Sequence, residues 1–227
     1  MLILSTLAVK GALQELVPLY GGAAPQLRLD PTALLMQSIN SGSRADLAIL
    51  TRAGIDTLSD SGVLSAESVR DVAISSIGIA VRQGAAMPDI SSVEAVRALL
   101  LSVPSLCYSR SGASGLHFAK VIRQLGIADE VERKANIIAS GFTAEAVADG
   151  RCEIAVQQVS ELLVVPGIAV VGALPAAINE TMTFSAAIFT DASASDEARE
   201  FLDFITDPRH ARLYHRHGLE LVRGPVS

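Results

Sequence analysis

Short β-rich runs alternate with helical patterns along most of this chain, and this alternation limits the fold more than any other feature. The first three strands are expected at LILS (2–5), QLRLD (26–30) and ADLAIL (45–50), and a helical pattern follows each of them. Strands that alternate with helices in this way form a parallel sheet covered by helices. The sequence therefore predicts an α/β fold.

A second series of strands and helices follows and predicts a second α/β lobe. Its strands are expected at 74–82, 105–109, 134–139, 152–158 and 168–174. A long strand at 182–190 then leads into two C-terminal helices. We expect one lobe to contain residues 1–78 and 188–227 and the other to contain residues 79–187, a division that 227 residues readily allow.

Charge and hydropathy exclude some classes of function. The net charge is -6 at pH 7, and the 18 Lys and Arg residues are dispersed, which argues against a nucleic-acid partner. No apolar run approaches the roughly 20 residues that cross a bilayer. We therefore expect a globular protein that is not embedded in a membrane and that meets any anion with local donors.

The N-terminus and the cysteines bear on the compartment. The opening MLILSTLAVKG lacks a basic leader and a small-residue cleavage site. It predicts a cytoplasmic protein, or a periplasmic one from which an export signal was removed. Cys107 and Cys152 lie in apolar strand-like segments, so we interpret them as buried small hydrophobic residues rather than a disulfide or a metal pair.

The loop SRSGASG at 109–115 has the composition of an anion-binding turn at a helix start. Helix N-termini offer unpaired N–H groups, serine hydroxyls add donors, and glycine lets the backbone approach closely. The same residues are also ordinary helix caps and turn formers, so the loop alone leaves both interpretations open. Arg110 would suit a carboxylate through its planar fork, or it is a solvated cation that pairs with a surface acid.

Four strand-to-helix segments occur in an order typical of a known family. These segments are Ser5 to Ala8, Pro31 to Ala33, Ser109 to Gly115 and Ala155 to Gln158, and SINSGSRADLAILT adds a further match. On them the chain resembles the type II periplasmic substrate-binding proteins, most closely their molybdate-binding family, over nearly its whole length. The resemblance implies a two-lobed fold with a ligand cleft between the lobes, a small anionic ligand and, if the protein is exported, an ABC transporter as partner.

The resemblance also implies which residues contact the ligand. In the molybdate-binding family a tyrosine contributes from a late strand, where this chain has Gln157, and Arg110 is a second departure from that pattern. Both departures favour an organic carboxylate over a bare oxyanion. The ligand-binding residues that we expect are Ser5, Thr6, Thr32, Ser109, Arg110, Ser111, Ala113, Ser114, Gly115 and Gln157.

Two functions from different classes follow. The first is a small-anion binding protein that holds an oxyanion or an organic carboxylate at helix N-termini in the cleft. The alternative is a cofactor-independent isomerase of a tricarboxylate, because the family resemblance extends to aconitate isomerases, which move a proton. No catalytic base is identified, since Lys10 and His117, both at the margin of the expected cleft, are the only further candidates for proton transfer.

Cofactor and metal motifs are missing from the sequence. It contains no Walker loop, GxGxxG, CxxC or GxSxG, so we expect no cofactor. His210, His215 and His217 have no carboxylate spaced to complete a metal site. We interpret that segment as a basic, exposed C-terminal helix.

Overall fold

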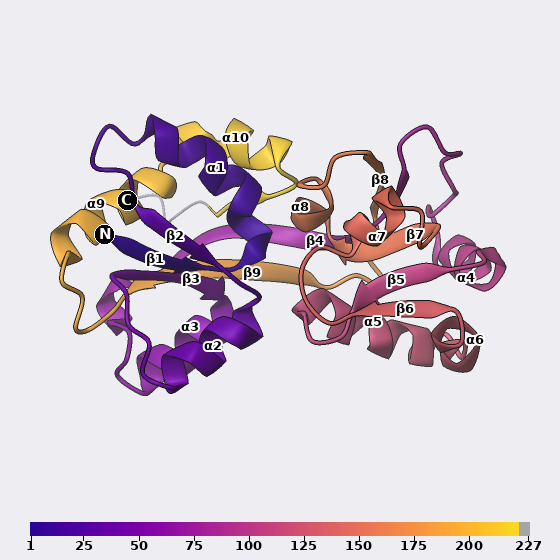
Figure 1. The fold of residues 1–227 in the computed structure, drawn as a ribbon, viewed down its shortest axis with the longest axis horizontal. Coiled ribbons are helices and arrows are strands. Elements are labelled where there is room, and N and C mark those ends of the chain that lie inside the picture. The colour runs from indigo at the N-terminus through magenta and orange to yellow at the C-terminus, as the bar shows by residue number, and fades with distance from the viewer. Residues whose placement is uncertain (223–227) are drawn as a thin grey trace. The chain divides into compact units, whose positions relative to one another are not determined.

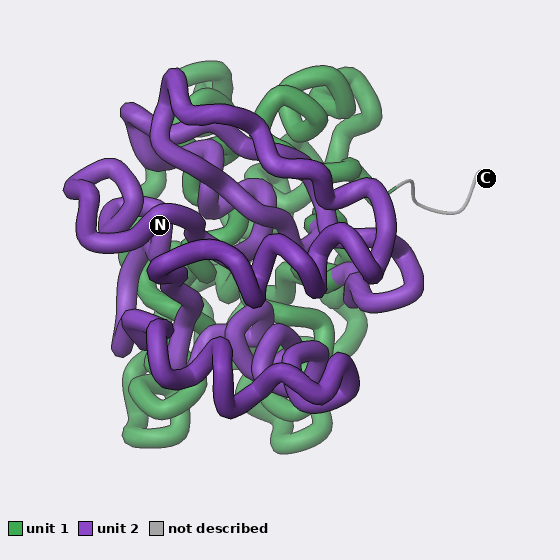
Figure 2. The backbone as a smooth tube through the Cα atoms, turned by 90° about the vertical axis from the view of Figure 1, so that its right-hand side faces the viewer, with its two compact units in different colours: residues 1–75, 182–227 green, residues 76–181 purple. Residues whose placement is uncertain are grey.

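The computed structural model describes residues 1–222, and the chain forms two compact units (Figure 2). Unit 1 contains Met1–Ser75 and Met182–Ser227, and unit 2 contains Ser76–Thr181. The chain passes between the units twice, within strand β4 (Arg70–Arg82) and at the start of strand β9 (Thr181–Ile188). Both units combine strands and helices, so the predicted α/β class is confirmed.

The two divisions lie earlier in the chain than the sequence suggested. The structure divides after residues 75 and 181, whereas the sequence analysis placed the divisions after 78 and 187. Each division falls inside a strand, β4 or β9, that continues without a turn. Local patterns cannot mark such a point, because turns and breakers are the signals that sequence reading uses for boundaries.

Unit 1 is built on a mixed sheet. The strand order is β2, β1, β3, β9 and β4, and β10 also pairs with β4. Strand β1 is parallel to β2 and β3, whereas β9 is antiparallel to β3. The remaining elements are β1 (Leu2–Ser5), η1 (Leu7–Val9), α1 (Lys10–Leu19), β2 (Gln26–Leu29), α2 (Thr32–Asn40), β3 (Leu47–Thr51), α3 (Arg52–Asp60), η2 (Ala66–Ser68), α9 (Ser195–Ile205), η3 (Pro208–His210), α10 (Ala211–Arg216) and β10 (Glu220–Leu221).

Helices cover both faces of the unit 1 sheet, with α1, α9 and α10 on one face and α2 and α3 on the other (Figure 1). Helix α9 illustrates the cause, because Ala198, Phe201, Leu202 and Ile205 recur at helical spacing and are all buried. These apolar side chains pack in one cluster with strands β1, β3 and β9. The apolar clusters on the two faces of the sheet hold its strands in place, and they therefore fix the positions of the turns at the strand ends.

Unit 2 contains a second group of paired strands, in which β5 lies between β6 and β7. The strand order is β4, β7, β5 and β6, with β8 also paired to β4. Strand β5 is parallel to β6 and β7, whereas β7 and β8 are antiparallel to β4. The elements are α4 (Val93–Ser102), β5 (Leu106–Ser109), α5 (Ala113–Gln124), α6 (Ala128–Glu132), β6 (Ala135–Ile138), α7 (Ala144–Ala148), β7 (Ile154–Gln158), α8 (Val159–Leu162) and β8 (Ile168–Ala173).

Both cysteines belong to the interior of unit 2. Cys107 and Cys152 are free and buried, which agrees with the interpretation of them as small hydrophobic residues. The Cys107 thiol donates to the carbonyl oxygen of Thr143 at 3.1 Å. Burial raises the pKa of this thiol, and the neighbouring Cys152 raises it further, so Cys107 stays protonated and has a packing role.

The C-terminal segment of unit 1 differs from its sequence interpretation. His210 is buried and packs against the Phe204 ring, with 4.7 Å between the ring centroids. His217 Nε2 lies 2.8 Å from a carboxylate oxygen of Glu15 on α1. The expectation of an exposed basic helix is therefore wrong for His210, because its imidazole fills the aromatic packing beside α9.

Within residues 1–222, none of the helices has the length and apolar character that spanning a bilayer requires. The same residues contain no group of three or more His, Cys, Asp or Glu side chains that could hold a metal ion.

Candidate functional site

The carboxyl ends of β1, β2 and β3 lie at one edge of the unit 1 sheet, because these three strands run parallel. Each strand leads into a helix within a few residues. Ser5 ends β1 at this edge and Thr6 follows it; both are buried, and the Thr6 N–H donates to the Ile49 carbonyl oxygen at 2.8 Å. This edge is where ligands bind in open α/β sheets.

Thr32, at the start of α2, offers an unused hydroxyl. Its Oγ1 is buried and has no hydrogen-bond partner among the described residues. A Cβ placed on Gly54 would lie 3.4 Å from both Thr32 Cγ2 and Thr51 Oγ1, so the starts of α2 and α3 lie close together. Thr51 was not among the predicted residues, although it ends the third strand of the same series and could have been found by that rule.

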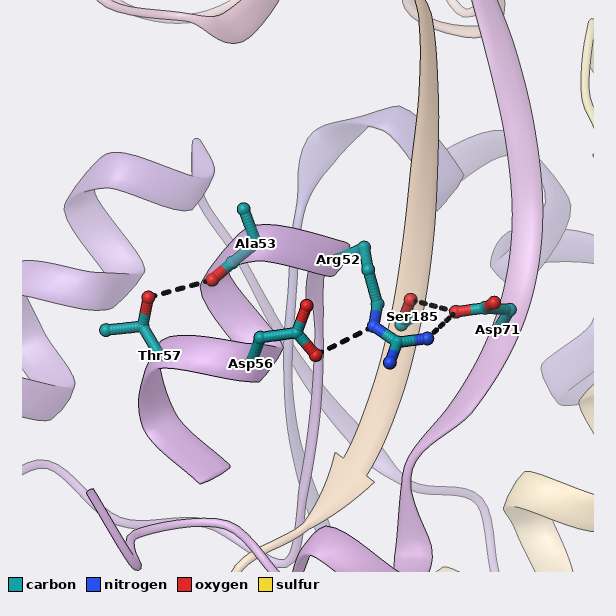
Figure 3. Close-up of polar contacts among 6 residues, drawn as sticks. All are labelled: Arg52, Ala53, Asp56, Thr57, Asp71 and Ser185. Atoms are coloured by element: carbon teal, nitrogen blue, oxygen red, sulfur yellow. Dashed lines mark hydrogen bonds and ion pairs between the residues drawn. The ribbon is translucent and has the colours of Figure 1, made fainter. Parts of the chain in front are cut away.

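Arg52 begins α3 and is held by two carboxylates (Figure 3). Its Nε lies 2.8 Å from an Asp56 oxygen, and its Nη1 lies 2.9 Å from an Asp71 oxygen. The same Asp71 oxygen accepts from the Ser185 hydroxyl at 2.6 Å. Two negative partners outweigh one guanidinium, so this cluster joins α3 to β4 and β9 and is a poor anion receptor.

In unit 2 the serine and glycine loop joins β5 to α5. The Ser109 hydroxyl accepts from the Gly112 N–H at 2.9 Å, so it serves first as a local turn former. Ser114 is buried in the first turn of α5, whereas Ser111 is exposed. The predicted residues of this loop, including the half-buried Ala113, therefore surround one helix start.

Gly115 allows this helix start to pack directly on the end of β5. A Cβ at Gly115 would lie 2.7 Å from the carbonyl carbon of Ser109 and closer still to its oxygen. Both atoms are backbone atoms and cannot rotate away. The glycine is therefore required by the close approach of two backbone segments, and its contact with an anion stays a prediction.

Arg110 differs from Arg52 because its guanidinium forms no ion pair within residues 1–222. Its backbone N–H donates to the Ile138 carbonyl oxygen at 2.8 Å, which fixes the loop to the end of β6. Its side chain is exposed and forms no ion pair or hydrogen bond with the described part of the chain. The alternative in which Arg110 pairs with a surface acid is therefore absent within residues 1–222.

Gln157 and Gln158 end β7 and have different surroundings. The Gln157 side-chain oxygen accepts from the Thr143 N–H at 2.8 Å and from the Thr143 hydroxyl at 2.9 Å, which fixes the start of α7. Gln158 is 3% exposed, and neither its amide oxygen nor its amide nitrogen has a hydrogen-bond partner in the described residues. A ligand contact of Gln157 stays a prediction, and Gln158 is the glutamine with free bonding capacity.

Glu161 lies in the first turn of α8, three residues after Gln158. Burial raises the pKa of its carboxyl to about 7, although hydrogen bonds from the Gln157 side chain and the Gln158 backbone favour the ionised form. Sequence reasoning missed this residue. The available signal was a glutamate three residues after the end of a strand, a spacing that is typical of a helix cap.

His117 is engaged in local contacts. Its Nδ1 lies 2.7 Å from a Glu180 carboxylate oxygen, and its Nε2 lies 2.9 Å from the Ile178 carbonyl oxygen. Both ring nitrogens therefore join α5 to the segment before β9. This arrangement is structural and leaves His117 a weak candidate for proton transfer.

The comparisons with known proteins agree with this architecture. Residues 2–220 match the family model described as bacterial extracellular solute-binding protein, and the chain belongs to that family. An aconitate isomerase of Pseudomonas sp is 29% identical over 230 residues, which cover 97% of this chain and 87% of that protein.

Two solved structures show the same fold. The periplasmic molybdate-binding protein of Azotobacter vinelandii has a TM-score of 0.83 at 16% identity, covering 98% of this chain and 100% of that chain. The substrate-binding protein of an ABC transporter from Agrobacterium tumefaciens has a TM-score of 0.70 at 13% identity, covering all of this chain and 81% of that one. The predicted resemblance to periplasmic substrate-binding proteins and their molybdate-binding members is confirmed.

Proposed function

We propose that this protein binds a small organic carboxylate at its strand-end turns. One observation supports this ligand class most directly. The Arg110 guanidinium is exposed and has no partner among the described residues, and it lies in a serine-rich loop at the start of α5. A planar guanidinium matches the two oxygens of a carboxylate, while the helix start supplies N–H donors. A compact oxyanion would need only the neutral donors and would leave Arg110 without a role.

Substitutions at Arg110 separate charge from geometry. Arg110→Lys keeps the charge but loses the two-pronged fork, so both it and Arg110→Ala are expected to weaken binding of trans-aconitate by about 10- to 100-fold. Ser111→Ala and Ser114→Ala are each expected to have smaller effects, because the backbone donors remain. The ligand-induced rise in melting temperature over a concentration series gives the affinity of each variant.

Arg123→Ala is the matched control, because Arg123 is exposed in the last turn of the same helix. Its affinity for trans-aconitate should equal that of the wild type. Molybdate binding that is weakened by the serine substitutions and indifferent to Arg110→Ala would contradict the proposed ligand class. Wild-type affinity in all the variants would show that the loop is only a helix cap.

A second candidate function is the isomerisation of a tricarboxylate by proton transfer. The 29% identity to an aconitate isomerase over 97% of this chain favours it specifically. Moving a proton between two carbon atoms of a bound carboxylate requires an acid–base group and no cofactor. Binding without this chemistry would instead suit a carrier that delivers the anion to an ABC transporter.

A further inference from the structure

We propose that Glu161 is the group that removes and returns the proton in this isomerisation, an inference that rests on the second candidate function. The residue lies in α8, three residues after the end of β7, and β7 is the parallel neighbour of β5, the strand that Arg110 follows. Its contact with the Gln158 backbone N–H otherwise indicates only that it caps α8.

The sheet of unit 2 places Glu161 at the same edge as the Arg110 loop. Strands β5 and β7 are parallel neighbours, with Tyr108 paired to Val156. The turns that follow the two strands therefore leave the sheet side by side. A carboxylate ligand held by Arg110 would thus lie at the edge where α8, the helix that contains Glu161, begins.

Unsatisfied polar groups accompany Glu161 in the sequence. Both amide atoms of Gln158 and the Ser160 hydroxyl are buried without a hydrogen-bond partner in the described residues. An unpaired buried polar atom is destabilising, so native proteins rarely retain one without a reason. An amide and a hydroxyl can both donate to carboxylate oxygens, which makes a polycarboxylate a suitable partner for either of these two side chains.

The surroundings of the Glu161 carboxyl are neutral. Its two hydrogen-bonding partners are an amide side chain and a backbone N–H, and none of the ion pairs within residues 1–222 includes it. With a pKa of about 7, the group is present in both protonation states near neutral pH. A group that accepts a proton and then returns it works best under that condition.

The proposed step is balanced without an oxidant or reductant. The Glu161 carboxylate takes a proton from the methylene carbon of bound aconitate, and the C–H electron pair forms a new carbon–carbon double bond. The π electrons of the former double bond move into the adjacent carboxylate, where Arg110 would stabilise the added negative charge. Glu161 then returns the proton to the other end of the three-carbon unit, and the enolate electrons form the new C–H bond.

The alternative is a purely structural role, in which Glu161 only caps α8 by accepting from the Gln158 N–H. Glu161→Gln separates the two, because glutamine retains the acceptor oxygen and the size of the side chain but cannot accept the proton. Glu145→Gln is the matched control, since Glu145 is an exposed acid in the first turn of α7 in the same unit.

Proton NMR of trans-aconitate incubated with the full chain in heavy water measures both conversion and deuterium incorporation, and calorimetry measures binding separately. We expect the wild type and Glu145→Gln to convert the ligand, and Glu161→Gln to bind it while converting it at least about 100-fold more slowly. If Glu161→Gln does not fold, Glu161→Asp, which displaces the carboxyl by one methylene, is expected to bind and to convert slowly.

Each other outcome overturns a defined part of the inference. Wild-type conversion by Glu161→Gln would remove Glu161 from the reaction and leave the isomerase function standing. Loss of binding in parallel with conversion would make it a ligand-positioning residue instead. Binding without conversion by the wild type would refute the isomerase function, and absence of binding would refute the carboxylate proposal itself.

Discussion

Gly115→Ala is expected to destabilise unit 2 by about 3 kcal/mol or more, the upper end of the range for overpacking. The added methyl group would lie 2.7 Å from the Ser109 carbonyl carbon, which is part of the β5 backbone and can move only if the strand or the helix moves. Urea denaturation should therefore give a lower midpoint with an unchanged slope. Carboxylate binding should weaken in the folded fraction, because the start of α5 is displaced.

Gly54→Ala is the matched control for this substitution. Gly54 and Gly115 occupy the same position of α3 and α5, the third residue of the helix. The nearest atoms to a Cβ at Gly54 lie at 3.4 Å, which is an ordinary contact. Alanine is the better helix former, so this variant should be neutral or slightly more stable. Equal effects of the two substitutions would contradict the close approach that we describe at Gly115.

Glu161→Gln is expected to stabilise the protein at pH 8 by about 3 kcal/mol, an effect that depends on pH. The pKa of Glu161 rises from an ordinary 4.5 to about 7 in the folded state, so the folded state binds the proton more tightly than the unfolded state does. Glu161 in the wild type therefore makes its full contribution to the free energy of unfolding below pH 4.5, and this contribution is lost as the pH rises through 7. Glutamine is neutral throughout and avoids this loss.

Urea denaturation of the wild type and Glu161→Gln between pH 4.5 and 8 measures this difference. The two stabilities should converge at the acidic end and separate as the pH rises, while Glu145→Gln should follow the wild type. A constant difference across the range would indicate a packing or capping effect. A wild type that is more stable than Glu161→Gln at pH 8 would show that the carboxylate is favourably solvated or paired.

Local patterns predicted much of the fold, because most of its strands and helices are decided by nearby residues. Strand β1 occupies Leu2–Ser5, the predicted segment, and β6 (Ala135–Ile138) lies within the predicted 134–139. Strand β10 was not predicted, since its two residues form a strand only by pairing with Ile74 and Ala73 of β4. Such a pairing joins residues distant in the chain and leaves no periodic pattern.

The candidate site was predictable only where composition shows it. The loop from Ser109 to Gly115 combines serine, glycine and arginine at a strand end, and each of these types has a local chemical meaning. Glu161 carries only the spacing of a helix cap, and its raised pKa is not visible in the sequence because it depends on burial. The pairing of Arg52 with Asp71, 19 residues away, could not be read from the sequence for the same reason. This pairing distinguishes Arg52 from Arg110, whose guanidinium has no partner within residues 1–222.

Calorimetric titration of the wild-type protein with trans-aconitate and, separately, with molybdate tests the central claim most directly. Binding of a small organic carboxylate predicts a saturable heat signal with trans-aconitate and none with molybdate at the same concentrations. A saturable signal with molybdate and no signal with trans-aconitate would contradict it. That result would indicate a site of neutral hydroxyl and N–H donors, as the molybdate-binding resemblance implies.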